Sequence, residues 1–329
     1  MKKIALLATG GTIASLSSEN GLAPAINAEQ LLHYCPRLKK NYQILVRDVF
    51  SLDSSNIQPE EWQILAKHVK EVADEVDGVV ITHGTDTMAY TAAALSFLLL
   101  CISKPVVLTG SQLSIAAPFS DAPGNIEEAF IAAATLPAGV FIAFHHQIIL
   151  GTRAVKMRTL SFDAFASINA SPVGYFDAEG LHLSLPNEEQ TVAQPKALGD
   201  SVDSRVFLLK LVPGTNPEIF RHLIETGYQG LVLECFGLGG LHYIRRNLVD
   251  SMKELSQKGI VTMVTTQCMY EKADFSIYEV GHAFLGLPNV YGAHDMTSEA
   301  AVAKLMWALG DRENRLQYLR TPLCYEMMV

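Results

Sequence analysis

The chain has 329 residues, of which 49% are hydrophobic and 18% charged, and its formal net charge is −9. This apolar content can fill a large core, so disorder is excluded for the chain as a whole. At roughly 150 residues per domain the length predicts about two domains, and an acidic chain without a basic run argues against a nucleic-acid partner.

Strands and helices alternate along the first half of the sequence. The helix that begins at Pro59 is marked by acidic residues in its first turn and by a helically spaced apolar stripe from Trp62 to Val72. Short apolar runs with turn residues at their ends predict the strands. The expected strands are residues 4–8, 46–49, 79–82, 106–108 and 140–143, and further helices are expected at residues 87–100 and 127–134.

The alternation resumes after a polar stretch at residues 186–204, which we interpret as an interdomain linker. It separates an expected N-terminal domain, residues 1–185, from a C-terminal domain, residues 205–329. Continuous apolar strands alternating with helices predict α/β domains with parallel sheets covered on both faces. The second half is expected to contain strands at residues 206–211, 231–233 and 260–265 and helices at residues 217–226, 247–258 and 297–309.

No segment predicts a membrane partner. The most apolar stretch, residues 92–102, is far shorter than the ~20 residues that cross a bilayer. The apolar run at the N-terminus ends at Thr9-Gly10-Gly11, below the about 7–15 residues of a signal-peptide core. The five cysteines form no CxxC pair, which argues against disulfides or a zinc site. We therefore expect a cytoplasmic protein.

Three polar turns that contain glycine follow expected strands. Ligand sites of open α/β sheets lie beyond the carboxyl ends of the strands, where glycine lets the backbone approach a ligand. Any one turn could be an ordinary connection, but three at one sheet edge predict a shared pocket. The turns are Thr9-Gly10-Gly11-Thr12-Ile13, Thr82-His83-Gly84-Thr85-Asp86-Thr87 and Thr109-Gly110-Ser111-Gln112.

Hydroxyl groups dominate these turns, and no cofactor or metal is expected. The sequence contains no GxGxxG, GxxxxGK[ST], HExxH or GxSxG motif. His145 and His146 lack further clustered ligands, and adjacent residues of a strand would face opposite sides of the sheet. The remaining interpretation is a hydroxyl nucleophile that acts with a carboxylate and a distant base.

The polar turns, together with further segments along the chain, resemble the motifs of one family. They are the turn Thr9–Ile13, the segment His83–Leu95, Asp53-Ser54-Ser55, Thr109–Gln112, Arg153–Lys156 ahead of Phe162–Phe165, and Thr266-Gln267-Cys268. The chain resembles the bacterial-type (class 1) L-asparaginases, and most of all their cytoplasmic type I branch. The resemblance implies two three-layer α/β domains, of which the larger N-terminal one is flavodoxin-like and the smaller C-terminal one Rossmann-like. It also implies a homodimer or a dimer of dimers.

The implied reaction is hydrolysis of L-asparagine to aspartate and ammonia through an acyl-enzyme on a threonine. Thr12 matches the nucleophile, and Thr85, Asp86 and Lys156 match a second triad. Asp86 is also expected to hold the substrate α-ammonium and Ser54 the α-carboxylate. The residues expected to bind substrate are Gly11, Asp53, Ser54, Ser55, Gly84, Thr85, Asp86 and Ser111. Lys156 can act as a base only when neutral, which burial favours and Asp86 opposes, and the Thr85 region can supply an oxyanion donor.

The sequence departs from the family pattern at two places. Leu22 occupies the position of the family's loop tyrosine, in the segment 15–24 that we expect to be a mobile lid. Glu234 and Gly240 replace an arginine and an asparagine, and Val155 replaces a threonine. Some type I members bind asparagine at an allosteric site near that arginine. A carboxylate there would repel an α-carboxylate, so we expect no such site.

Two other functions compete with L-asparagine hydrolysis. A related amidase could prefer L-glutamine or D-asparagine, since one methylene is worth only about 1–3 kcal/mol of discrimination. The archaeal tRNA-dependent amidotransferase subunit is similar, but it carries an extra N-terminal domain for which the position of Thr12 is expected to leave no room. A non-catalytic amino-acid sensor would need the binding groups but no nucleophile.

Overall fold

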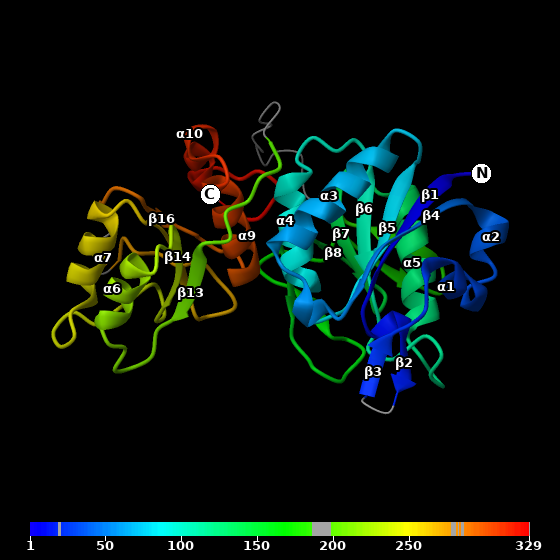
Figure 1. Cartoon of the computed structure of the whole chain (residues 1–329), viewed down its shortest axis with the longest axis horizontal. Coiled ribbons are helices and arrows are strands. Elements are labelled where there is room, and N and C mark those ends of the chain that lie inside the picture. Colours follow the sequence, from blue (N-terminus) through cyan, green and yellow to red (C-terminus); the bar gives the residue numbers. More distant parts are fainter. Residues whose placement is uncertain (19–20, 186–198, 278–280, 282, 284–285, 329) are drawn as a thin grey trace. The chain divides into compact units, whose positions relative to one another are not determined.

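The computed structural model describes residues 1–18, 21–185, 199–277, 281, 283 and 286–328. The chain divides into two compact units, Met1–Gln190 and Thr191–Val329. Each unit is a sheet with helices packed on it, shown in Figure 1. No helix in the described residues is long and apolar enough to cross a membrane.

The N-terminal unit is built on an eight-stranded sheet with the order β12-β11-β8-β7-β6-β5-β1-β4. Its parallel part, β4-β1-β5-β6-β7, has the flavodoxin-like order 2-1-3-4-5 when only these strands are counted. The strands are β1 (Lys3–Gly10), β4 (Gln43–Leu52), β5 (Gly78–Thr82), β6 (Pro105–Thr109), β7 (Gly139–Phe144), β8 (Gln147–Leu150), β11 (Gly174–Asp177) and β12 (Gly180–Leu183). The expected parallel α/β core is therefore confirmed, and β8, β11 and β12 extend it in antiparallel fashion.

Helices cover both faces of this sheet. The helices α3 (Pro59–Ala73) and α4 (Met88–Leu98) pack on each other, while α5 (Ala122–Thr135) packs on β5, β6 and β7 (Figure 1). Two shorter helices, α1 (Ala28–Tyr34) and α2 (Leu38–Asn41), precede β4. The helix α3 begins as predicted, because Pro59 occupies its first turn and Glu61 accepts a hydrogen bond from the Gln58 N–H. Its predicted apolar stripe is buried.

The segment after Thr12 differs from the expected irregular loop. A 3₁₀ turn, η1 (Thr12–Ala14), leads into a hairpin of β2 (Ser15–Ser18) and β3 (Gly21–Pro24), in which Leu22 pairs with Ser17. The tip, residues 19–20, lies outside the described residues. Alternating serine and apolar residues suit a strand, which the polar composition of the segment concealed.

The C-terminal unit has a four-stranded parallel sheet in chain order. Its strands are β13 (Val206–Lys210), β14 (Gly230–Cys235), β15 (Val261–Thr266) and β16 (Val290–Gly292). Its helices and turns are α6 (Glu218–Glu225), α7 (Leu248–Gln257), α9 (Ser298–Leu309), α10 (Arg312–Arg315) and η3 (Leu316–Arg320). Every strand and helix expected here is present. Residues 186–198 of the expected linker lie outside the described residues, and residues 199–204 form no helix or strand.

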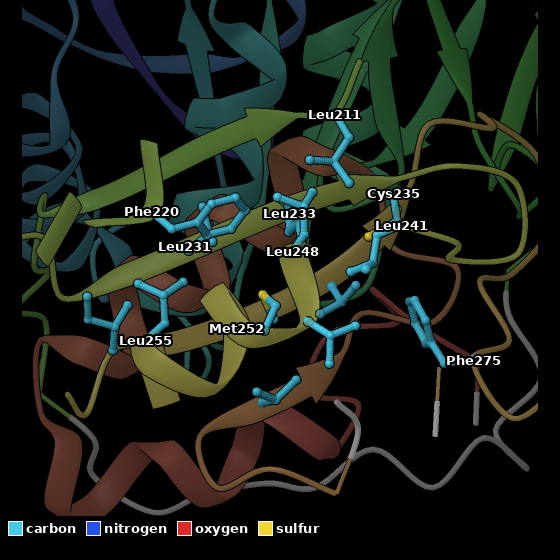
Figure 2. Close-up of a cluster of buried hydrophobic side chains, with 14 of the residues drawn as sticks. Leu211, Phe220, Leu231, Leu233, Cys235, Leu241, Leu248, Met252, Leu255 and Phe275 are labelled. Carbon is cyan, nitrogen blue, oxygen red and sulfur yellow. The ribbon is translucent and has the colours of Figure 1, made fainter. Parts of the chain in front are cut away.

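A buried cluster joins α6 and α7 to one face of this sheet. Figure 2 shows Phe220 of α6 beside Leu231 and Leu233 of β14, with Met252 and Leu255 of α7 below them. Each of these side chains is at most 1% exposed. Burial of apolar surface contributes about 25 cal/mol per Å², so this cluster stabilises the unit.

Candidate active site

The loops after four neighbouring strands meet at one edge of the N-terminal sheet. The connection after β1 carries Thr12, the one after β4 carries Ser54, the one after β5 carries Thr85, and the one after β6 carries Ser111. The flavodoxin-like order reverses direction at β1 and β5, and such a switch point is where ligands bind in open α/β sheets. The structure thus brings the three predicted turns and the Asp53–Ser55 segment to one place.

Two glycines and a serine hold these loops against one another. A Cβ added to Gly11 would lie 2.4 Å from the Cα and the N of Gly84. A Cβ added to Gly84 would lie 2.6 Å from Oγ of Ser54. Gly11 also has a φ of +79°, which side-chain-bearing residues rarely adopt. The backbone immediately before Thr12 and Thr85 is therefore held by close contacts that leave no room for a Cβ.

The Ser54 side chain ties the β4 loop to the β5 loop. The N–H of Asp86 donates to Ser54 Oγ at 3.2 Å, and the hydroxyl of Thr87 donates to the Ser54 carbonyl at 2.7 Å. Ser54 is 3% exposed. Because Oγ accepts from the backbone, its own proton stays free to donate to a ligand, and no acceptor for it is found among the described residues.

The amine of Lys156 connects two of the predicted catalytic residues. Lys156 ends β9 (Ala154–Lys156), which pairs with β10 (Phe165–Ser167). Its Nζ donates to Thr85 Oγ1 at 2.8 Å and to Asp86 Oδ1 at 2.6 Å. The lysine side chain is 18% exposed, whereas the Asp86 side chain is 62% exposed and open to a soluble ligand. The structure therefore brings Thr85, Asp86 and Lys156 together.

Asp53 and Ser55 form a small exposed turn beside Ser54. The hydroxyl and the N–H of Ser55 both donate to Asp53 Oδ1, at 2.6 and 2.9 Å. These hydrogen bonds hold the pKa of Asp53 below its usual value. Ser111, by contrast, is buried, and its hydroxyl donates to the Leu113 carbonyl within its own loop.

Gln112 and Asp121 were not among the predicted site residues. The Gln112 side chain accepts from the Thr85 hydroxyl at 3.4 Å and donates to the Ser161 carbonyl at 3.0 Å. The carboxylate of Asp121 accepts from the N–H groups of Gln112 and Leu113. The turn Thr109–Gln112 signalled Gln112, but no pattern in the sequence signals that Asp121 holds this loop.

Two backbone N–H groups are left unused beside the contact of the glycines. Those of Thr12 and Thr85 donate in no hydrogen bond within the described part of the chain. Each follows one of the two glycines in contact, Gly11 and Gly84. Unused N–H groups next to a threonine hydroxyl can stabilise the oxyanion of an acyl-transfer reaction.

The histidine pair lies in a turn beside an acidic side chain. The expectation that His145 and His146 lie on a strand is wrong. They lie in the tight turn between β7 and β8, with φ values of +46° and +63°. The Nδ1 of His146 lies 2.5 Å from the nearly buried Glu128 carboxylate. Among the described residues no group of three or more histidine, cysteine or acidic side chains could hold a metal ion.

Both halves of the chain match known protein families. Residues 3–189 match the family described as asparaginase, N-terminal, and residues 205–320 match the glutaminase/asparaginase C-terminal domain. An L-asparaginase of Thermococcus kodakarensis is 42% identical over 94% of this chain and 93% of its own. A glutamyl-tRNA(Gln) amidotransferase subunit of Sulfurisphaera tokodaii is 36% identical over 97% of this chain and 73% of its own.

Solved structures agree over the whole length. The thermostable L-asparaginase from Thermococcus kodakarensis gives a TM-score of 0.90 at 38% identity, covering 99% of both chains. L-asparaginase I from Vibrio cholerae gives 0.86 at 30% identity, covering 100% of this chain and 99% of the other. A probable cytoplasmic L-asparaginase from Campylobacter jejuni gives 0.82 at 28% identity, covering 97% and 99%. The chain therefore belongs to the asparaginase family and is an amidohydrolase.

Proposed function

We propose that this protein hydrolyses L-asparagine to L-aspartate and ammonia through an acyl-enzyme on Thr12. The observation that carries the proposal is the Lys156 amine, held between the Thr85 hydroxyl and the Asp86 carboxylate at the loop that contacts Gly11. The identity to the L-asparaginase of Thermococcus kodakarensis supports the choice of substrate.

Substrate binding follows from the charges of the site. The exposed Asp86 carboxylate suits the α-ammonium group of an amino acid, and the free proton of the Ser54 hydroxyl suits its α-carboxylate. Asp53, Ser55 and the backbone of Gly11, Gly84 and Ser111 form the remaining wall. These contacts orient the side-chain amide towards Thr12.

The reaction then needs two acyl-transfer steps. The Thr12 oxygen attacks the amide carbon, its proton is taken up by the Thr85–Lys156 pair, and the carbonyl oxygen becomes an oxyanion near the free N–H groups. Collapse of this intermediate breaks the C–N bond, and ammonia leaves with that proton. Water then attacks the Thr12 ester and releases aspartate. Lys156 must be neutral to accept a proton, although the Asp86 carboxylate favours its charged form.

Activation without the family's loop tyrosine is part of this proposal. Leu22 lies on β3, and its side chain falls outside the described residues. A leucine has no proton to transfer, so Thr85 and Lys156 carry the activation of Thr12 alone. The hairpin 15–24 serves as a lid over the pocket.

The test is ammonia release from L-asparagine, D-asparagine and L-glutamine in parallel. We expect turnover of L-asparagine that Thr12→Ala abolishes and that the control Thr135→Ala, an exposed threonine of α5, leaves unchanged. Retention of ammonia release in Thr12→Ala would contradict the assignment of Thr12 as the nucleophile.

A second candidate is a related amidase with another preferred substrate. It is favoured by the 36% identity to the amidotransferase subunit of Sulfurisphaera tokodaii, which shows that similar chains take part in other amide chemistry. Faster ammonia release from L-glutamine or D-asparagine would support it. Binding of amino acids without any ammonia release would instead support a sensor.

We further propose a cytoplasmic homodimer or dimer of dimers, with domains at residues 1–185 and 205–329 and a linker between them. The Campylobacter jejuni relative is described as probably cytoplasmic, and its chain is covered almost completely. Light scattering coupled to gel filtration tests the assembly. A monomer at micromolar concentration would contradict it.

A further inference from the structure

One buried group of the candidate site has no part in the reaction described so far. His83 lies between β5 and Gly84 and is 0% exposed. Its Nδ1 lies 2.7 Å from the Gly84 carbonyl oxygen. A carbonyl oxygen has no proton to give, so Nδ1 carries the proton and Nε2 carries none. Nε2 has no hydrogen-bond partner within the described residues.

The imidazole is neutral at physiological pH. Burial lowers the pKa of His83 to about 4. A neutral ring with its proton fixed on Nδ1 is a permanent single donor, and that donor is directed at one carbonyl. The ring therefore neither supplies a charge to the site nor exchanges a proton with it.

The backbone of His83 is itself held on both sides. Its N–H donates to the Thr109 carbonyl at 2.8 Å. A Cβ added to Gly110 would lie 2.3 Å from the His83 carbonyl oxygen, so β6 and its loop press closely on this residue. These contacts fix the backbone of His83, and with it the position from which the ring donates to the Gly84 carbonyl.

The hydrogen bond to Gly84 also determines the direction of the next N–H group. The Gly84 carbonyl and the Thr85 N–H belong to one planar peptide, and no peptide bond among the described residues is cis. The Thr85 N–H must therefore point away from the carbonyl, and so away from the buried imidazole. A hydrogen bond accepted by the carbonyl also polarises the amide and strengthens its N–H as a donor.

We propose that His83 is a positioning residue, whose ring N–H holds the Gly84 carbonyl and thereby directs the Thr85 N–H at the oxyanion formed on the substrate amide. The inference rests on the proposed acyl transfer through Thr12, because attack on the amide by Thr12 and attack on the resulting ester by water both form an oxyanion there. His83 acts through Gly84 and touches no reacting atom.

The test compares three substitutions of His83. Asparagine places an N–H donor on Cγ where the imidazole has Nδ1, leucine has the same branched outline without a donor, and glutamine places its amide one bond further out. We measure kcat and KM for L-asparagine, and the Kd of L-aspartate by calorimetry. The thermal melting of each variant is recorded to establish that it is folded.

His83→Leu is expected to lower kcat about 10- to 100-fold, less than the roughly 10²–10³-fold cost of deleting an oxyanion donor outright. KM and the aspartate Kd should stay within about threefold of the wild type, since no ground-state contact is lost. His83→Asn should recover kcat to within about fivefold of the wild type. If the leucine variant does not fold, His83→Gln takes its place and is expected to show the same loss.

Equal kcat values for the asparagine variant and the donor-free or displaced-donor variant would overturn the inference. A loss confined to KM or to aspartate binding would overturn it as well, because that pattern indicates a distorted binding site. A wild type that releases no ammonia from any amide would overturn both this inference and the proposed function. If the wild type is active and the asparagine variant has the same kcat as the leucine or glutamine variant, only this inference is overturned.

Discussion

Gly11 and Gly84 are in such close backbone contact that a Cβ on the first would lie 2.4 Å from the Cα of the second. This contact joins the loops that carry Thr12 and Thr85. The loops follow β1 and β5, which are adjacent in the sheet. The hydroxyl of Thr9 also donates to the Thr82 carbonyl across these strands, between residues 73 positions apart in sequence. The geometry of the candidate nucleophile thus depends on two residues without side chains.

Gly11→Ala should therefore lower kcat by at least about 100-fold, because backbone atoms cannot move aside as a flexible side chain can. The matched control is Gly227→Ala, which has a similar φ of +82° against +79° but open space around its Cβ. Both variants should lose about 1–3 kcal/mol of stability from backbone strain, measured by urea unfolding. Ammonia release should fall only in Gly11→Ala, and equal activity of the two variants would contradict the prediction.

Removing the Lys156 amine should abolish most of the activity. Lys156→Met eliminates the hydrogen bonds to Thr85 and Asp86, and we expect kcat to fall at least about 10³-fold, within the range for loss of a general base. Lys67→Met, an exposed lysine of α3, is the control. Lys156→Arg keeps the positive charge but cannot become neutral. Its kcat should be as low as that of the methionine variant, and substantial activity would show that charge alone suffices.

Stability should fall in acid through His83. Burial lowers its pKa to about 4 in the folded protein, against about 6.5 in an unfolded chain. The unfolded chain therefore binds more protons between these values, so stability is lost as the pH falls from about 6.5 to 4. The loss is about 3 kcal/mol in total and about 2 kcal/mol between pH 7 and 5.

Urea unfolding at pH 7 and pH 5 measures this effect. His83→Asn removes the titrating ring, so its stability should change by about 2 kcal/mol less than that of the wild type over the same interval. All other ionisable groups are common to both proteins and cancel in the difference. An identical pH dependence would show that the ring titrates normally in the folded protein.

We expect velocity to depend hyperbolically on asparagine concentration. Glu234 is the penultimate residue of β14, and its carboxylate lies 2.5 Å from the Ser298 hydroxyl. Burial, with a smaller contribution from Glu234, raises the pKa of the neighbouring Glu299. A region that already crowds two carboxyl groups disfavours a third from an amino-acid effector. Initial rates over a wide concentration range provide the measurement. A sigmoidal curve that Glu234→Ala renders hyperbolic would contradict the prediction.

The C-terminal unit should depend on one buried ion pair. Lys304 of α9 and Glu326 are both 0% exposed, with Nζ and Oε1 2.6 Å apart. Lys304→Met leaves the carboxylate buried without its cation and should cost about 3–5 kcal/mol. The double variant Lys304→Met, Glu326→Leu should be less destabilised than the single one. A single variant within about 1 kcal/mol of the wild type in urea unfolding would contradict this.

The alternating core could be predicted from the sequence, and the family resemblance named Thr85, Asp86 and Lys156, which the structure places together. The core could be predicted because its strands are continuous apolar runs, as in residues 79–82. The hairpin 15–24 could not, because its serines read as a polar loop, and β11 and β12 have no such apolar run. Asp121 was missed because its role depends on backbone N–H groups of Gln112 and Leu113, and such contacts leave no mark in the pattern of side chains.

The short ladder of β9 and β10 has a consequence for engineering. Lys156 is paired directly with Phe165, so the position of its amine is set by this register and not by the number of residues that lie between. Insertions into residues 157–164 should change the loop whose Ser161 carbonyl accepts from Gln112, while leaving the amine in place. Deleting one residue inside the strand itself would instead turn Lys156 to the opposite face. The connecting loop and the position of the amine are thus separable engineering targets within a single hairpin.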